Sequence, residues 1–225
     1  MIEPCLWDSE FFGYTVGRKH IAEGESADYD AIMTEAEEAG VRLLYLFSDA
    51  PLENFPVKPA DVKLVYSTGI DSSAAVLPEC EVLECPEPAV YELAYRSGRH
   101  SRFFTDPGIG TEKFREMYGI WVDNSFSGDM GDKVFVKRVG REIAGFVTLA
   151  LHGNSGSIGL IAVGENFGRK GIGTALVECC KRTLFDAGLP RLDVATQQAN
   201  SEACAFYEKN GFVVSKTTYI YHLWI

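Results

Sequence analysis

A glycine-rich turn with two adjacent basic residues is the stretch of this chain best suited to chemistry. Residues 164–171 contain three glycines together with Arg169 and Lys170. A helix that starts inside such a turn presents unpaired backbone N–H groups and the positive end of its dipole, and glycine lets a phosphate approach them. The turn therefore predicts a pyrophosphate site, and an ordinary strand-to-helix turn is the alternative.

The turn differs from two common phosphate-binding patterns. Neither Gly164 nor Gly168 is followed at the required spacing by the Gly-Lys-Ser/Thr of nucleoside triphosphatases. Gly171-Ile172-Gly173 is followed by Leu176 where the dinucleotide-binding fingerprint has its third glycine. Neither pattern describes this turn.

The turn lies between a predicted strand and a predicted helix. Residues 157–163 are apolar and bounded by glycines, which is typical of a buried strand. Apolar residues at helical spacing from Gly171 onward predict a helix that ends at Gly188, ahead of Pro190. The same periodicities predict helices at 28–39, 90–99, 112–126 and 200–210, and strands at 41–47, 62–66, 81–85, 134–139, 142–151, 191–196, 213–215 and 218–224.

Composition limits the classes of function. The chain has 225 residues, of which 46% are hydrophobic, and a formal net charge of −11, which indicates a globular protein and argues against nucleic acid as a partner. No apolar run approaches the roughly 18 residues of a membrane span and no leader pattern is present, so a cytoplasmic location is expected. The six cysteines show no zinc spacing, so we expect no metal and reduced, buried thiols.

A change in sequence composition near Leu77 predicts two domains. Pro78, Pro86 and Pro88 cluster at this point. We expect a small N-terminal α/β domain at residues 1–77, which would serve as a support or lie on the substrate side, and a second domain at residues 78–225.

Two runs of residues in the second half resemble motifs of the GNAT acetyltransferase superfamily. The glycine turn after Val163 resembles its acetyl-CoA loop, although Gly168 stands where the family usually has Gln or Arg. The spacing of the second motif is matched at Asn200, Ala203, Phe206, Tyr207, Gly211 and Phe212. The resemblance implies the GNAT fold, of class α/β (α+β) with a mixed, mostly antiparallel central sheet, and an acetyl-CoA-dependent N-acetyltransferase.

The resemblance also implies how acetyl-CoA would bind. The strand backbone would pair with the pantetheine amides, the loop amides would hold the pyrophosphate, and the Asn200 side chain would bond the pantetheine arm or an ordered water. The expected cofactor-binding residues are Ile161, Ala162, Val163, Gly168, Arg169, Lys170, Gly171, Ile172, Gly173, Thr174, Asn200 and Tyr207.

Tyr207 is expected to be the catalytic acid. It matches the family's tyrosine that protonates the departing thiolate, and a phenol with a pKa near 10 keeps its proton at neutral pH. The alternative is that Tyr207 packs as an aromatic side chain beside Phe206. No general base is identified, because loop carboxylates such as the candidates Glu165 and Asp132 are usually just solvated, and water can remove the proton of a sugar amine.

Three segments favour a sugar acceptor. Residues 7–13, 101–103 and 194–197 resemble, within the family, the enzymes that acetylate the 4-amino group of dTDP-linked deoxyaminosugars. The resemblance implies a nucleotide-activated amino sugar of the dTDP-4-amino-4,6-dideoxyhexose type as the partner. Residues 7–13 would form a wall of the sugar pocket or a turn that packs the domains together.

Aromatic and basic residues after His100 are the expected acceptor-binding residues. Arg102 could hold a diphosphate through paired N–H bonds, and Phe103 or Phe104 could stack on a base or sugar. The helix face that bears Tyr118 and Trp121 is expected on the acceptor side as well. The alternative is a structural ion pair of Arg102 and core packing of the aromatic rings. A peptide, lysine or polyamine acceptor, a catalytically silent acyl-CoA sensor, and a homodimer also remain open.

Overall fold

The chain forms two compact units in a computed structural model that describes residues 1–22, 24–71 and 80–225. Unit 1 comprises Met1–Leu64, Gln197–Ala199 and Lys216–Ile225, and unit 2 comprises Val65–Thr196 and Asn200–Ser215. The predicted boundary between residues 77 and 78 lies outside the described residues and stays a prediction.

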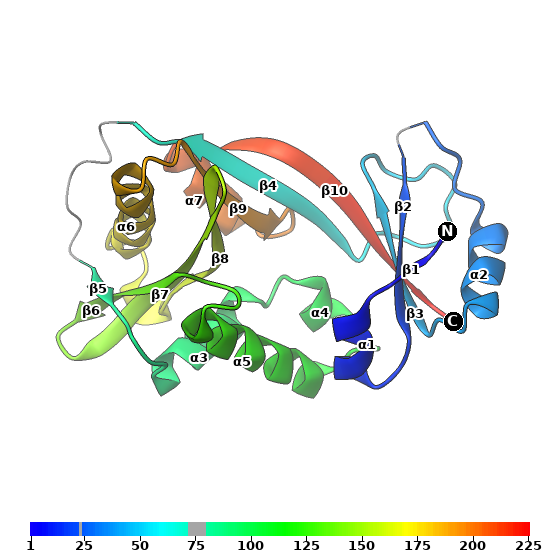
Figure 1. The fold of residues 1–225 in the computed structure, drawn as a ribbon, viewed down its shortest axis with the longest axis horizontal. Helices are drawn as coiled ribbons and strands as arrows, with labels where there is room; N and C mark the ends of the chain where they lie inside the picture. Colours follow the sequence, from blue (N-terminus) through cyan, green and yellow to red (C-terminus); the bar gives the residue numbers. More distant parts are fainter. Residues whose placement is uncertain (23, 72–79) are drawn as a thin grey trace. The chain divides into compact units, whose positions relative to one another are not determined.

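Unit 1 is organised around a β-α-β unit (Figure 1). Its two parallel strands, β2 and β3, are flanked by β1 and by the last part of β10, which both pair antiparallel. The elements of unit 1 are β1 (Glu3–Pro4), α1 (Leu6–Phe12), β2 (Val16–Ile21), α2 (Tyr29–Glu38), β3 (Leu43–Ser48), the start of β4 (Asp61–Gly69) and the end of β10 (Val213–Trp224).

Local signals explain the helices of unit 1. The Asp28 side chain accepts a hydrogen bond from the Ala31 N–H and so begins α2 as predicted. Residues 7–13, which we expected to form a turn or a wall of the sugar pocket, lie in the helix α1 and in Gly13, which ends it at φ 76°. Their role at a sugar pocket stays a prediction. Strand β2 was not predicted, because its centre reads Arg-Lys-His and hides the apolar alternation.

Unit 2 contains a sheet with the strand order β10-β4-β9-β8-β7-β6-β5. Its described pairs from β5 to β8 are antiparallel, and β8 pairs parallel with β9. The elements of unit 2 are β5 (Glu81–Val82), α3 (Pro88–Ser97), α4 (Arg102–Thr105), α5 (Thr111–Ser127), β6 (Lys133–Val139), β7 (Glu142–His152), β8 (Ser155–Val163), a 3₁₀ turn (Glu165–Phe167), α6 (Ile172–Asp186), β9 (Arg191–Gln197), α7 (Ser201–Lys209) and parts of β4 and β10.

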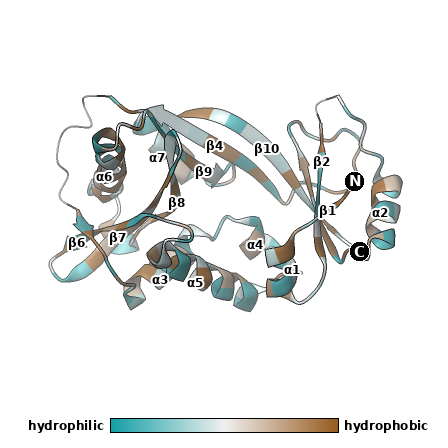
Figure 2. Cartoon of the chain, in the orientation of Figure 1, coloured by the Kyte–Doolittle hydropathy of each residue, from teal (hydrophilic) through white to brown (hydrophobic). Residues whose placement is uncertain are grey.

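Helices cover both faces of this sheet (Figure 1). On one face, α3 and α5 bury a core that includes Val136 and Phe146. Gly145 and Gly156 lie on the opposite face, where a Cβ on Gly156 would stand 2.7 Å from the Leu184 side chain of α6. Figure 2 shows hydrophilic and hydrophobic residues alternating along α5, as expected for a helix with one buried face.

The predicted fold class is confirmed, with two local corrections. Strand β5 covers two residues and is shorter than the predicted 81–85. The predicted strands 213–215 and 218–224 form one continuous strand, β10. In the described ranges, every helix is too short or too polar to cross a lipid bilayer.

The expectation of reduced thiols is wrong for two of the cysteines. Cys80 and Cys179 form a disulfide across a sequence separation of 99 residues. Cys179 lies on α6 and is followed directly by Cys180, which is a buried free thiol. A bond between residues so far apart leaves no spacing pattern in the sequence.

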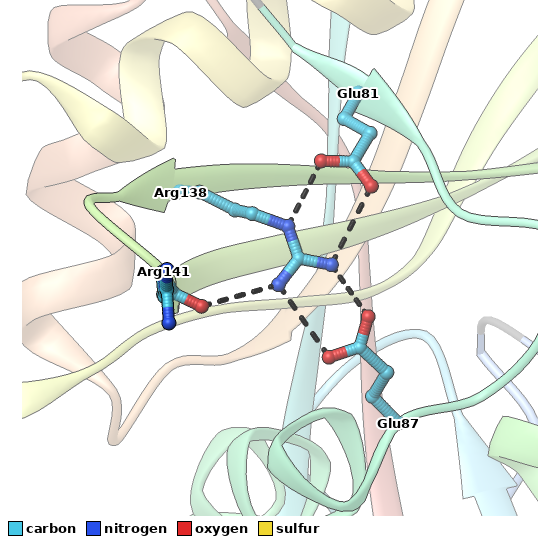
Figure 3. Close-up of polar contacts among 4 residues, drawn as sticks. All are labelled: Glu81, Glu87, Arg138 and Arg141. Carbon is cyan, nitrogen blue, oxygen red and sulfur yellow. Dashed lines mark hydrogen bonds and ion pairs between the residues drawn. The ribbon is translucent and has the colours of Figure 1, made fainter.

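An arginine on β6 holds the edge strand β5 (Figure 3). The Arg138 Nε donates to Glu81 Oε2 at 2.9 Å, and its Nη2 donates to Glu87 at the start of α3. The hydrogen bonds that Arg138 donates to Glu87 and, to a smaller extent, to Glu81 raise the pKa of Arg138 above its ordinary range. The planar guanidinium thus joins β5, α3 and the β6–β7 hairpin, whose Arg141 carbonyl it also contacts.

Candidate functional site

Strand β8 separates from its parallel neighbour near its carboxyl end. Among the described residues, β8 pairs with β9 from Gly156↔Leu192 to Ile158↔Val194, although β8 continues to Val163. On its other side β8 stays paired with β7 as far as Gly145↔Val163. In residues 159–163 of β8, the edge that would face β9 therefore lies beyond the described pairing; we call it the open edge.

A β-bulge marks the point of separation. Val147 pairs with Ile161 and Leu149 pairs with Ile158, so two residues of β8 stand opposite the single residue Thr148. An extra residue bends a strand and increases its twist. The bend begins directly after Ile158, which is also where the described pairing with β9 ends.

The backbone of the separated segment has a defined direction. The Gly164 N–H donates to the Ala144 carbonyl at 2.8 Å, and the Ala162 carbonyl lies 2.9 Å from the position of a Cβ on Gly145, so both face β7. Alternate residues of a strand face opposite edges. The N–H and C=O groups of Ile161 and Val163 therefore point toward the open edge.

The predicted phosphate turn leads directly into α6. Its backbone takes left-handed conformations at Arg169 (φ 60°) and Gly171 (φ 76°), the second of which is the N-cap of α6 and carries no capping side chain. The first α-helical bond runs from the Ala175 N–H to the Gly171 carbonyl. The amides of Ile172, Gly173 and Thr174 precede that bond, as in other anion-binding helix starts.

The basic pair of the turn is exposed to solvent. The Lys170 Nζ donates to the Asn166 carbonyl at 3.0 Å, which folds this side chain back over the turn. Arg169 has a positive φ, which residues other than glycine usually avoid. The surrounding backbone therefore sets its place in the turn.

The structure brings the two motifs together. A Cβ on Gly173 would lie 3.0 Å from the Phe206 ring of α7 and 3.6 Å from the Val163 side chain. A side chain at this position would push against the Phe206 ring, so glycine fits closely where α6, α7 and the end of β8 meet. The strand, the turn and the second motif form one site within unit 2.

Asn200 precedes the first residue of α7, and Tyr207 lies in its last turn. The Asn200 Oδ1 accepts from the Ala203 N–H at 3.2 Å, so Asn200 is the N-cap of α7 and its side-chain NH₂ takes no part in this bond. Tyr207 is 3% exposed, and its ring lies 5.6 Å from Tyr66 and 5.7 Å from Phe212. Burial, with the thiols nearby, raises the pKa of Tyr207 above its ordinary value of 10, so the phenol is protonated at neutral pH.

Both carboxylates considered as bases have structural partners. Glu165 forms an ion pair with Arg96 of α3. The Asp132 Oδ2 accepts from the Leu151 N–H at 2.6 Å and closes the end of β7. These contacts explain both residues without a role in proton transfer. In the described ranges, no three His, Cys, Asp or Glu side chains gather as ligands for a metal ion.

The expected acceptor residues belong to one chain of aromatic contacts. The Arg102 guanidinium lies 4.1 Å from the centre of the Phe103 ring, which in turn contacts Trp121 at 5.8 Å. Phe104 is 42% exposed and packs on Phe114 at 5.0 Å. Arg102 and Trp121 thus share a neighbour, while Phe104 lies at the far end of the aromatic chain.

Sequence reasoning did not single out Thr148, which stands opposite the bulge of β8. It is the one hydroxyl residue inside the otherwise apolar strand β7, and it is 2% exposed. The signal that could have revealed it is a polar residue in the middle of an apolar run, opposite a strand that carries an interior glycine, Gly159.

Known proteins resemble the chain in sequence. The model of the Acetyltransferase (GNAT) family matches residues 101–212. The chain is 29% identical over 150 residues to the spore coat polysaccharide biosynthesis protein SpsD of Bacillus subtilis (strain 168), covering 62% of this chain and 49% of SpsD. It is 28% identical over 118 residues to N-alpha-acetyltransferase 30 of Homo sapiens, covering 50% of this chain and 33% of that protein. The chain thus spans about half or less of the relatives it matches.

Solved structures resemble the chain in fold. A functionally unknown conserved protein from Staphylococcus epidermidis ATCC 12228 has a TM-score of 0.59 at 13% identity, covering 93% of this chain and 83% of that one. A GCN5-related N-acetyltransferase from Sphaerobacter thermophilus has a TM-score of 0.56 at 13% identity, covering 87% of this chain and 65% of that one. At such low identity these likenesses show the fold alone.

Proposed function

The chain belongs to the GNAT acetyltransferase family through residues 101–212, and from this premise we propose that it transfers the acetyl group of acetyl-CoA to an amino group of a nucleotide-activated amino sugar. The acceptor class proposed is the dTDP-4-amino-4,6-dideoxyhexose type. The observation that carries the proposal is the separated edge of β8 beside the start of α6.

The residues present fit acetyl-CoA. Pantetheine contains two amides, and the N–H and C=O groups of Ile161 and Val163 point to the open edge, where an extended chain adds as a strand. The amides of Ile172 and Gly173 at the start of α6 suit the pyrophosphate. Arg169 and Lys170 add positive charge next to them in a chain whose net charge is −11.

Tyr207 is proposed to donate its proton toward the departing sulfur. The substrate amine forms a C–N bond with the thioester carbon, the C–S bond breaks, the nitrogen loses a proton to water, and the sulfur takes one from the phenol, which is restored from solvent. In water the phenol is a weaker acid than a thiol by about 1.5 pKa units, or about 2 kcal/mol. Buried surroundings raise the pKa of phenol and thiol alike, so this gap stays modest.

The extent of similarity supports a sugar acceptor. The match to SpsD, whose name places it in polysaccharide biosynthesis, covers 62% of this chain, against 50% for N-alpha-acetyltransferase 30. Arg102 on Phe103 offers a guanidinium for a diphosphate and an aromatic face for a base. A cytoplasmic location and a homodimer stay predictions.

A peptide N-terminus is the second candidate acceptor. It is supported by the similarity to N-alpha-acetyltransferase 30 of three vertebrates, at 28–29% identity over 118 residues. Those matches cover no more than 43% of the relatives' own length, so they support the candidate through the shared domain only.

Thiol release from acetyl-CoA, measured with a panel of acceptors, tests both candidates. The panel holds nucleotide-linked 3-, 4- and 6-amino sugars, a polyamine and a peptide with a free N-terminus. Tyr207→Phe should lower turnover about 100-fold or more. Tyr91→Phe is the matched control, because its hydroxyl bonds the exposed Asp123 instead.

The outcomes separate the proposals. Turnover with a nucleotide-linked amino sugar, lost in Tyr207→Phe and kept in Tyr91→Phe, supports the acceptor and the acid. Turnover with the peptide or polyamine alone overturns the sugar assignment. Acetyl-CoA binding without turnover on any acceptor contradicts the enzyme and favours an acyl-CoA sensor.

A further inference from the structure

The bulge in β8 leaves a backbone amide that the β7–β8 pairing does not satisfy. Residues 159 and 160 both stand opposite Thr148, and a two-strand pairing provides one backbone partner there. A buried amide without an acceptor is strongly disfavoured. Leu160 is 8% exposed, so its N–H needs an acceptor within the protein.

The Thr148 hydroxyl provides that acceptor. The Leu160 N–H donates to the Thr148 Oγ1 at 2.9 Å, and the Thr148 side chain is 2% exposed. A side-chain oxygen thus takes the place of the carbonyl that the bulge has displaced. Valine would fill the same volume and leave the Leu160 amide without an acceptor.

Gly159 makes room for the hydroxyl. A Cβ at this position would stand 2.9 Å from the Thr148 Oγ1, closer than side-chain atoms ordinarily approach. The Gly159 backbone has no positive φ and the residue is exposed, so the hydroxyl of Thr148 is the feature that an added methyl group would disturb. Residues 148 and 159 therefore hold the bulge in place from its two sides.

We propose that Thr148 and Gly159 are positioning residues that set which backbone groups of β8 face the acyl-CoA arm; this rests on the proposed function. The bulge fixes the register of residues 161–163. If it is lost, β8 slips by one residue and exchanges the groups at its two edges, because alternate residues face opposite sides. Ala162 would then face the open edge, while Ile161 and Val163 would pair with β7.

Five variants test the pair. Thr148→Val removes the acceptor, Thr148→Ser keeps it, and Gly159→Ala displaces the hydroxyl from the other side. Thr183→Val is the control for losing a threonine hydroxyl, since its Oγ1 bonds the Cys179 carbonyl within α6. Gly69→Ala is the control for an added methyl group, since Gly69 is an exposed strand glycine with no atom within 4 Å of its Cβ position.

The main measurement is the Kd of acetyl-CoA by calorimetry, with amide hydrogen exchange at Leu160. Loss of one or two backbone hydrogen bonds predicts a Kd about 5- to 30-fold higher in Thr148→Val and Gly159→Ala. Thr148→Ser, Thr183→Val and Gly69→Ala should bind as the wild type does. Hydrogen exchange at the Leu160 amide should be faster in Thr148→Val and Gly159→Ala, and unchanged in the other three variants.

Each outcome decides the matter. Wild-type affinity in Thr148→Val and Gly159→Ala overturns the inference while leaving the proposed function intact. Failure of the wild type to bind acetyl-CoA overturns both. If Thr148→Val does not fold, Gly159→Ala carries the test, because Gly159 is exposed and the Thr148 Oγ1 is the one atom near the position of its added methyl group. A weaker Kd with an unchanged Tm separates positioning from general destabilisation.

Discussion

Removal of the Cys80–Cys179 disulfide should strongly destabilise unit 2. The bond joins residues separated by 99 positions, and a closed loop of that length lowers the entropy of the unfolded chain by an amount worth about 4.7 kcal/mol. Measured values for native disulfides run from about 2 to 5 kcal/mol. Each kcal/mol shifts the Tm of a chain of this size by about 2–4 °C, so Cys80→Ser should lower the Tm by about 4–20 °C.

The assay compares melting with and without a reductant. The Tm of the wild-type protein should fall when the disulfide is reduced. The Tm of Cys80→Ser should be equally low with and without the reductant. Cys85→Ser is the control, because Cys85 is an exposed thiol outside the bond. Reduction should also add the mass of two hydrogens to the intact chain. An unchanged mass on reduction, or a Cys80→Ser Tm equal to that of the wild type, refutes the reasoning.

Three further predictions concern a cap, a clamp and a buried phenol. Asn200→Ala removes the acceptor for the Ala203 N–H and should cost about 1 kcal/mol in urea melts, which Asn200→Asp should restore. Arg138→Gln should lower the Tm and speed hydrogen exchange in β5, and Arg138→Lys should not rescue it, because only the planar guanidinium binds both carboxylates; rescue by lysine would contradict the clamp. The raised pKa of Tyr207 means that the unfolded chain loses its phenolic proton first, so stability is full below pH 10 and falls above it by about 1.4 kcal/mol per unit. Urea melts at pH 9 and 11 should show a loss of stability in both proteins, because Tyr66 and Cys180 also have raised pKa values, but the loss should be smaller by about 1.4 kcal/mol in Tyr207→Phe. An equal loss in the two proteins would refute the reasoning.

The fold could be predicted where local periodicity and turn chemistry agree. The helix from Gly171 to Gly188 and the cap at Asp28 both follow from signals within a few residues, and both are found. Strand β2 and the edge strand β5 depend on neighbours far along the chain. Their backbone is held by β3 and by Arg138, which no local pattern reveals.

The candidate site was predictable as a set of residues and less so as a geometry. The motif around Gly173 and Phe206 correctly indicated that the turn and α7 belong together. The bulge opposite Thr148 was hidden, because an extra residue in a strand changes the register without changing the composition. The disulfide of Cys80 could not be predicted either, because two cysteines 99 residues apart leave no recognisable spacing in the sequence.

The pairing of β10 with β3 affects how unit 1 is made during synthesis. Strand β3 carries Leu43, Leu44 and Leu46, all at 0% exposure, and pairs with β10 over Tyr219↔Ser48 to Trp224↔Leu43. At the usual speed of translation, β3 leaves the ribosome roughly 10–30 s before its partner is made. During that interval a leucine-rich strand has an open edge, which invites aggregation or capture by a chaperone. Loss of the last ten residues, Lys216–Ile225, would therefore damage the N-terminal unit first.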